Sequence, residues 1–481
     1  MDRTRAERAS SPTDVLVVGG GYVGLTAAGC MASLGHRVWC LEADPDRLRV
    51  LAGGGVPIVE PGLPELLADA RAEGRLVFTG DVREAVANAR IAFLCVGTPP
   101  DEEGRPDLRQ LGRAARAVAA AAPGDLLLVV KSTVPPGTAE ALELLCAEEA
   151  AAGRVDVASN PEFLREGRAV EDFLKPDRVV IGASSAQIGH RLAELYPGGW
   201  PVIIADRRSA ELVKYAANAF LAMKISFANE IAGLCERLGA DGPTVLRGVG
   251  ADGRIGAAFL GPGPGFGGSC LPKDLAGLIA AAGVVGYEPS MASAARHVNE
   301  RARDGLVTKL DAALGGLGGA RIGVLGLAFK PGTDDVRDSP AIALVRALAA
   351  RGALIRAHDP LAAPAGLPAE QAPDPYEAAS DADAVVVATA WPEFAELDLA
   401  RLRRAMAGQV LVDAVGVLAP DEVRGAGLHP YGVGRGIATS LHPVVWRPLE
   451  WALEELGEGP HGGSPGRASE PAGGTEQLAR A

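Results

Sequence analysis

The chain of 481 residues has no paired cysteines, no excess of positive charge and no long apolar segment. Its six cysteines are scattered without a CxxC pair, which is typical of reduced thiols and argues against a disulfide framework or a zinc site. A net charge of -13 excludes a general nucleic-acid-binding surface, because such a surface must be basic. No apolar run reaches the roughly 18 residues of a membrane span, and the polar N-terminus does not resemble a secretory signal. We therefore expect a cytoplasmic protein with no nucleic-acid, membrane or metal partner.

Lysine is also scarce, with seven residues against 40 arginines. A lysine that persists against this background marks a place where a compact ammonium group is needed, although chance explains any single position equally well. Four of the seven lie in distinctive motifs, at Lys131, Lys214, Lys273 and Lys330.

The most unusual stretch is GPGPGFGGSCLPKD at residues 261–274. Seven of its first ten residues are Gly or Pro, which no regular helix or strand tolerates. We predict a loop that comes close to a ligand and presents Cys270 at the start of a helix. Cys40 and Cys95 lie inside apolar strands instead and are expected to be core residues.

A dinucleotide-binding pattern lies near the N-terminus. An apolar strand at residues 14–18 is followed by GGGYVG, a helix at 25–34 and a second strand at 37–41. This order is that of the GxGxxG fingerprint. Its glycines, Gly19, Gly21 and Gly24, permit a tight turn and a close approach of the pyrophosphate to the helix N-terminus.

Glu42 ends the second strand, where an acid hydrogen-bonds the ribose 2′-OH and repels a 2′-phosphate. We therefore predict NAD in preference to NADP. Three interpretations of Arg47 stay open: it accommodates a 2′-phosphate, it stacks on adenine, or it lies in solvent.

Two further strands, at 91–96 and 126–130, are followed by Thr98 and Thr133. Ligands of open parallel sheets sit at the carboxyl ends of the strands, so both threonines are candidates for the cofactor or substrate edge. The alternative is that both threonines belong to ordinary turns, because Thr beside Pro is common in loops. Glu162 and Glu166 follow the strand at 155–158 and share one face if that segment is helical. A carboxylate there would act as a general base or hold a ribose.

Residues 210–238 contain no proline and predict a long helix that bridges domains or forms a dimer interface. Lys214 and Asn218 share one face of this apolar helix, which indicates a site, with a solvated stripe as the alternative. A second α/β unit follows, with strands at 322–325, 353–357, 384–388 and 410–412. It has no full GxGxxG and is expected to bind a mononucleotide. One of its helices is expected to start near Ser339-Pro340, with the proline at its first position.

Nine motifs, in order, resemble the UDP-glucose/GDP-mannose dehydrogenase family over residues 13–445. They are GGGYVGL (19–25), PIVEPGL (57–63), FLCVGTP (93–99), KSTVPPGT (131–138), NPEFLREG (160–167), KYAANAF (214–220), DGRIG (252–256), GFGGSCLPKD (265–274) and LAFKPGTDDVRDSP (327–340). The forms NPEFLREG and GGSCLPKD are similar to the UDP-glucose or GDP-mannose branch, and less so to the N-acetyl-mannosamine branch.

The pattern and the resemblance together imply an α/β protein with two Rossmann-like, doubly wound parallel-sheet domains and a central helical domain. The expected segments are a disordered leader (1–12), an NAD-binding domain (13–208), a central dimerisation domain (209–312), a nucleotide-sugar-binding domain (318–455) and a disordered tail (457–481). A homodimer or higher homo-oligomer is expected.

The resemblance implies two successive oxidations of a nucleotide-sugar alcohol, with UDP-glucose as the expected substrate and two NAD⁺ reduced per turnover. Cys270 would add to the aldehyde, and hydride loss would leave a thioester that water hydrolyses. We expect the helix N-terminus and Lys273 to lower the pKa of the thiol. Two alternatives stay open: GDP-mannose as the substrate, and a non-catalytic nucleotide-sugar sensor.

The same resemblance implies roles for individual residues. Lys214 and Asn218 would hold the catalytic water and the developing oxyanion. Glu162 would be the general base, with Asp274 and Thr133 completing the water network. The expected cofactor contacts are Gly19, Gly21, Tyr22, Val23, Gly24, Glu42, Arg47, Thr98, Thr133, Glu166, Lys273 and Arg337. The expected substrate contacts are Phe163, Leu164, Lys214, Asn218, Phe266, Gly267, Phe329, Lys330 and a neighbouring subunit's Arg254.

The chain departs from the family pattern at two positions. Val415 stands two residues after Asp413, where the family usually has an arginine that helps to bind the nucleotide. Val59 stands where an aromatic residue is common. The first departure bears on the nucleotide half of the substrate and not on the chemistry.

Overall fold

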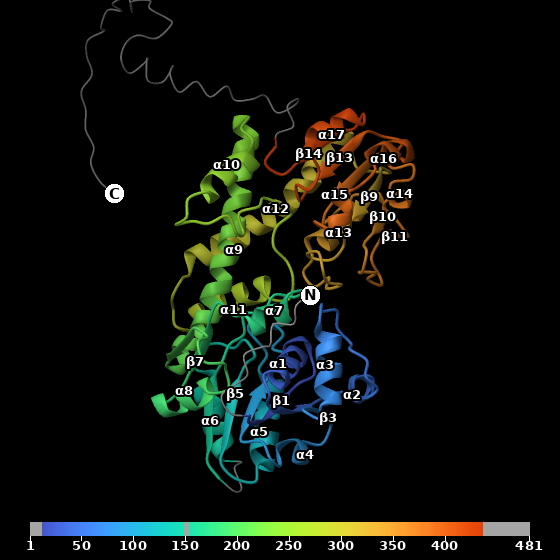
Figure 1. Cartoon of the computed structure of the whole chain (residues 1–481). Coiled ribbons are helices and arrows are strands. Elements are labelled where there is room, and N and C mark those ends of the chain that lie inside the picture. The colour runs from blue at the N-terminus through green and yellow to red at the C-terminus, as the bar shows by residue number, and fades with distance from the viewer. Residues whose placement is uncertain (1–11, 149–152, 436–481) are drawn as a thin grey trace, which may run out of the picture.

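The computed structural model describes residues 12–148 and 153–435. It confirms the predicted class, with two Rossmann-like sheet domains joined by central helices. Figure 1 shows the two sheets at opposite ends of these helices, with the long helix α9 in green between them. The predicted leader, except for its last residue, and the whole predicted tail lie outside the described residues.

The first sheet has eight strands in the order β3-β2-β1-β4-β5-β6-β7-β8. The strands from β3 to β6 in this order are parallel, but β7 pairs antiparallel with β6, so the sheet is mixed. The strands are β1 (Asp14–Val18), β2 (Arg37–Leu41), β3 (Leu76–Thr79), β4 (Ile91–Leu94), β5 (Leu126–Val130), β6 (Val155–Ser159), β7 (Val179–Gly182) and β8 (Val202–Ala205).

Helices cover both faces of this sheet, and its central strands are therefore apolar throughout. In β1, Val15 and Val17 enter one buried cluster, whereas Leu16 and Val18 enter another on the opposite face. The helices are α1 (Tyr22–Ser33), α2 (Pro45–Ala52), α3 (Leu63–Ala72), α4 (Val82–Val86), α5 (Arg109–Ala121), α6 (Thr138–Ala147), α7 (Ala169–Leu174) and α8 (Ala186–Ala193).

The central part is helical, with α9 (Arg207–Leu238), α10 (Gly242–Gly250), α11 (Leu271–Val284) and α12 (Ser290–Leu314). The helix α9 has 32 residues and begins three residues before the predicted start, because Asp206 caps its first turn. It ends at Gly239, which adopts the left-handed conformation at φ 71°. Since α9 packs against α11 and α12, it holds the loop before α11 in place.

The second sheet has six parallel strands in the order β11-β10-β9-β12-β13-β14. They are β9 (Arg321–Leu325), β10 (Leu354–His358), β11 (Glu370–Gln371), β12 (Ala384–Val387), β13 (Val410–Asp413) and β14 (His429–Gly432). The helices are α13 (Pro340–Ala350), α14 (Pro375–Ala378), α15 (Pro392–Ala395), α16 (Leu399–Ala405) and α17 (Pro420–Gly425). Ser339 caps α13 and Pro340 is its first residue, as predicted.

One local expectation differs from the structure. Residues 160–165 are irregular, so Glu162 and Glu166 do not share a helical face. The proline at 161 removes a backbone donor, and the Glu162 carboxylate accepts a bond from the Leu164 amide at 2.6 Å, which closes a local turn. The two acids therefore occupy separate places in the site.

Residues 12–148 and 153–435 were found to contain neither a helix that could span a membrane nor a cluster of metal-binding side chains. No helix there is long and apolar enough to cross a membrane. No group of three or more His, Cys, Asp or Glu side chains there is arranged to hold a metal ion.

Candidate active site

The long helix brings its two polar residues to the segment that follows β6. Lys214 Nζ lies 3.2 Å from Glu162 Oε1, and both side chains are almost completely buried. Burial opposes the charge of Lys214, but the Glu162 carboxylate, the Cys270 thiol and Asp274 outweigh it and raise its pKa above the ordinary value. Lys214 is therefore an ammonium ion at neutral pH.

Asn218 lies one turn along α9 and faces the start of α11. Its Nδ2 donates to Asp274 Oδ2 at 2.5 Å, and Lys273 Nζ lies 2.5 Å from the other carboxylate oxygen. Asp274 has no exposed surface. The carboxylate thus fixes the orientation of the Asn218 amide group.

Cys270 is the residue immediately before α11, as predicted. Burial and the Glu162 carboxylate raise the pKa of its thiol, and the nearby Lys214 only partly counteracts them. The expectation that Lys273 and the helix N-terminus lower this pKa is therefore wrong. The ammonium group of Lys273 contacts Asp274, and a nearly enclosed thiol loses hydration when it ionises.

The glycine turn after β1 has the geometry that a dinucleotide needs. Gly19 adopts φ 106°, and a Cβ added to Gly24 would lie 1.8 Å from the Gly19 carbonyl oxygen. The space beside Gly21 is open, and no side chain caps the N-terminus of α1. The free amides of this first turn therefore suit an anionic pyrophosphate.

Glu42 lies at the end of β2, beside this turn. Its two oxygens accept bonds from Gly20 N at 2.9 Å and Asp44 N at 2.7 Å. Arg47 Nη1 lies 3.5 Å from the same carboxylate, so the arginine is drawn toward Glu42. This arrangement favours a ribose hydroxyl over a 2′-phosphate at Glu42.

The structure places the side chains of Tyr22 and Val23 away from the open turn. The Tyr22 hydroxyl donates to Glu60, and the Gly167 amide donates to the same carboxylate at 2.7 Å. Val23 packs against the sheet core. Glu60 was missed by residue-level reasoning, although PIVEPGL was noted as a motif. It ties the glycine turn to the end of the 160–167 segment.

Thr98 and Thr133 meet beyond the ends of β4 and β5. Thr98 Oγ1 donates to the Thr133 carbonyl at 2.9 Å, which fixes the two loops against each other. Lys131, two residues earlier, is buried and donates to Asn160 Oδ1 at 3.0 Å. This contact was not predicted, although Lys131 was noted as one of the few lysines of the chain.

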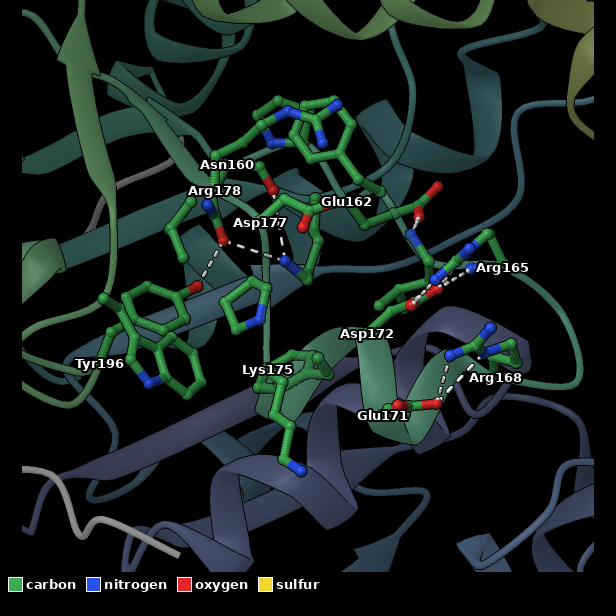
Figure 2. A pocket seen from close by; sticks show the side chains of 18 residues that line it. Asn160, Glu162, Arg165, Arg168, Glu171, Asp172, Lys175, Asp177, Arg178 and Tyr196 are labelled. Atoms are coloured by element: carbon green, nitrogen blue, oxygen red, sulfur yellow. Dashed lines mark hydrogen bonds and ion pairs between the residues drawn. The ribbon is translucent and has the colours of Figure 1, made fainter. Parts of the chain in front are cut away.

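A pocket of about 260 Å³ lies beside the segment that carries Glu162. Figure 2 shows the labelled side chains of Asn160, Glu162, Arg178 and Tyr196 around it. The guanidinium of Arg178 lies 3.8 Å from the centre of the Phe163 ring, a stacking geometry. Lys214 Nζ lies 5.5 Å from the same ring centre, so two cations lie close to the Phe163 ring.

The second sheet domain closes the site from the other side. Gly268 adopts φ 83°, and an added Cβ would lie 2.6 Å from the Phe329 ring, so the two residues are in close contact. Lys330 Nζ donates to the Glu166 carbonyl, and Arg337 Nη2 lies 3.3 Å from Glu166 Oε1. Three predicted site residues of this domain therefore meet the Cys270 loop or the 160–167 segment.

Other predicted residues lie elsewhere. Phe266 is buried in the apolar cluster of the central helices, and an added Cβ on Gly267 would lie 2.3 Å from the Asp338 carbonyl oxygen. The Arg254 side chain is 89% exposed and pairs with Asp252 in its own loop. Phe266 and Gly267 thus shape the loop, while Arg254 is directed to solvent within a single chain.

Three segments match parts of one known family. Residues 13–198 match the NAD binding domain of the UDP-glucose/GDP-mannose dehydrogenase family, 208–301 its central domain and 323–420 its UDP binding domain. The chain belongs to the UDP-glucose/GDP-mannose dehydrogenase family. Membership confirms the resemblance found in the motifs and the prediction of NAD as the cofactor.

Curated relatives match nearly from end to end. The UDP-glucose 6-dehydrogenase of Rhizobium meliloti (strain 1021) is 45% identical over 435 residues, which cover 88% of this chain and 99% of that protein. The Pseudomonas aeruginosa UDP-glucose 6-dehydrogenase is 43% identical over 439 residues, covering 87% and 97%. A structure of a UDP-glucose dehydrogenase from Pyrobaculum islandicum superposes with a TM-score of 0.83 at 44% identity, covering 89% and 99%.

Proposed function

We propose that this chain oxidises the C6 alcohol of UDP-glucose to a carboxylate, with two NAD⁺ reduced and one water consumed. The observation that carries the proposal is the buried group of Lys214, Asn218, Glu162 and Asp274 around Cys270. A protein that only bound the sugar would not need a partly buried thiol beside an ammonium group. The two relatives above, named UDP-glucose 6-dehydrogenases, support the choice of substrate.

The first sheet domain is proposed to hold NAD. The uncapped turn of α1 fits the pyrophosphate, and Glu42 fits the adenosine ribose. NAD⁺ would supply the hydride acceptor when bound, and Thr98 and Thr133, which follow β4 and β5, would help to hold it. The remaining chemistry belongs to the side chains of the chain itself.

Cys270 Sγ is proposed to add to the aldehyde carbon that the first oxidation produces. The carbonyl oxygen would then take up negative charge, which the Lys214 ammonium and the Asn218 amide would stabilise. Loss of a second hydride leaves a thioester on Cys270. Glu162 would remove a proton from the attacking water, and cleavage of the C–S bond would release the carboxylate and the thiol.

The nucleotide sugar is proposed to lie between the first sheet domain and the second. Phe163 and Leu164 line it from the 160–167 segment, and Phe329 and Lys330 from the turn after β9. Val415 provides no charge for the nucleotide. Its amide donates to the Asp413 carboxylate at 3.2 Å, which fixes the backbone after β13.

A direct test is to mix the protein with NAD⁺ and UDP-glucose and record absorbance at 340 nm. We expect two NADH per UDP-glucose consumed, and no net turnover for Cys270→Ser. Cys235→Ser, at the far end of α9, is the matched control and should retain activity. GDP-mannose is assayed in parallel, and faster turnover of GDP-mannose would reassign the substrate. No NADH with either sugar would refute the proposed reaction.

We also propose a homodimer through the central helices. Phe220, Phe227 and Leu234 recur every seven residues along α9 and are 60%, 46% and 49% exposed. An apolar stripe of this kind is typical of a helix that packs against a partner. Light scattering after gel filtration should give twice the chain mass, and Phe227→Asp should give the monomer.

A further inference from the structure

One hydroxyl group connects the thiol of Cys270 to a carboxylate that has so far been assigned only to the cofactor. Ser269 Oγ lies 3.5 Å from Cys270 Sγ and 2.9 Å from Glu166 Oε1. A serine hydroxyl both donates and accepts, so the thiol proton has a continuous hydrogen-bonded route to Glu166. The contact joins residues that are 103 positions apart in the chain.

The other carboxylates near the thiol are already engaged. Glu162 uses one oxygen for Lys214 at 3.2 Å and the other for the Leu164 amide at 2.6 Å. Asp274 uses its two oxygens for Lys273 and Asn218, both at 2.5 Å. Neither carboxylate is hydrogen-bonded to Cys270 or Ser269 among the described residues, so neither has the direct link to the thiol proton that Glu166 has.

Glu166 differs from both of them. Its Oε2 is buried and has no hydrogen-bond donor among the described residues, so this carboxylate is less stabilised as an anion than the other two. Burial and the neighbouring Asp335 carboxylate raise the pKa of Glu166 to about 7, although Ser269 and Arg337 oppose the shift. A general base is most effective when its pKa lies near the working pH.

We propose that Glu166 accepts the thiol proton of Cys270 through the Ser269 hydroxyl. The S–H bond breaks and its proton moves to Ser269 Oγ, while the proton of the Ser269 O–H bond moves to Glu166 Oε1. Sulfur keeps the electron pair as a thiolate, Glu166 becomes a neutral acid, and nothing is oxidised or reduced. The inference rests on the proposed function, in which Cys270 is the nucleophile.

The charged groups around this path fit that direction of transfer. The Cys270 sulfur is faced by Lys214 of α9, by Glu162 and by Asp274 of α11, and Arg337 approaches from the second sheet domain. The two cations favour a thiolate, while the carboxylate of Glu162 opposes it. Transfer to Glu166 removes one negative charge from the site as the thiolate forms, so the net charge of the site does not change.

The test is the rate at which iodoacetamide alkylates Cys270 between pH 5.5 and 9.5, with mass spectrometry to locate the adduct and with no NAD or sugar present. The other five cysteines are buried, which favours selective labelling. In the wild type we expect a first rise centred near pH 7, where Glu166 ionises, and a separate rise at higher pH, where the thiol ionises directly. Ser269→Ala should lose the step near pH 7 and react about tenfold more slowly at pH 7, although Glu166 is still present. Ser269→Thr keeps a hydroxyl and should recover the step.

Two further variants complete the test. Glu166→Gln should lose the step near pH 7, because no acceptor remains. Ser226→Ala removes another buried hydroxyl of the central helices, one that donates to the Ala295 carbonyl, and should leave the profile unchanged. Retention of the step in Ser269→Ala, or its loss in Ser226→Ala, would overturn the inference. Because the assay needs no turnover, it can fail while UDP-glucose oxidation is observed, and the reverse also holds.

Discussion

Replacing Lys214 with methionine should destabilise the protein, because Glu162 would keep its charge in a buried place without a partner. The two charged atoms are 3.2 Å apart, and the side chains are 4% and 7% exposed. At an effective dielectric constant of about 20, such a pair attracts by about 5 kcal/mol before the cost of desolvation is subtracted. Removing one partner of a buried pair typically costs about 3–5 kcal/mol, and we expect a loss in that range.

A double-mutant cycle isolates this interaction. Lys214→Met and Glu162→Gln are compared singly and together by urea unfolding at pH 7.5, with the midpoint interpreted only where the slope is unchanged. The double variant should be more stable than the sum of the single losses predicts, by about 2 kcal/mol or more. Lys224→Met on the same helix is the matched control, because the Lys224 ammonium donates to two carbonyl groups, at 3.1 and 3.2 Å, and has no carboxylate partner among the described residues.

The pH dependence follows from the raised pKa of Lys214. Its contribution to stability is fully present below the unfolded value of about 10.4 and is lost as the pH rises through the higher folded value. The coupling should therefore be constant from pH 6 to 9 and decline above about pH 10.5. The reasoning is refuted if Lys214→Met unfolds within about 0.5 kcal/mol of the wild type, or if the cycle shows no coupling.

Three further outcomes are expected. Gly24→Ala should lower the Tm and abolish NAD binding, because its Cβ would lie 1.8 Å from a backbone oxygen. Gly21→Ala meets open space and should keep the wild-type Tm, so an equal loss of Tm in both variants would contradict this geometry. Gly268→Ala should lower the free energy of unfolding by about 1–2 kcal/mol, because of its φ of 83° alone. It should also lower kcat by displacing the Phe329 ring, and an unaltered kcat and Tm would contradict this prediction. Glu166→Gln should raise the free energy of unfolding at pH 8 by up to about 3 kcal/mol but have little effect at pH 4.5. The reason is that a carboxyl group whose pKa is raised from 4.5 to about 7 destabilises the fold only as the pH rises through that interval. Equal effects at both pH values would exclude this cause.

Features that depend on neighbouring residues could be predicted from the sequence. The glycine turn at Gly19 requires a positive φ, and Ser339-Pro340 is a local helix-start signal, so both were identified correctly. The strands at the centres of both sheets were found because buried parallel strands are continuous apolar runs, whereas the four edge strands, β3, β8, β11 and β14, were not predicted. The segment at 160–165 was ambiguous, because its turn depends on a contact between the Glu162 side chain and a nearby amide.

The direction of the Cys270 pKa shift could not be predicted from sequence. Sequence proximity suggested that Lys273 acts on the thiol, yet that lysine pairs with Asp274, and the groups that do act come from α9 and the segment after β6. Burial dominates this shift, and burial is a property of the packed chain. Glu60 was missed for the same reason, since its partners lie 38 and 107 residues away.

The sequence by itself determined the cofactor turn, the two α/β halves, the long helix and the presence of a cysteine at a helix start. These depend on φ angles, caps and apolar periods that act over a few residues. Only the tertiary structure decided that Lys214 meets Glu162 and that Ser269 meets Glu166, 103 residues away. Such contacts follow from how α9, α11 and the first sheet pack, and no local pattern encodes the distance or the burial that sets their electrostatics.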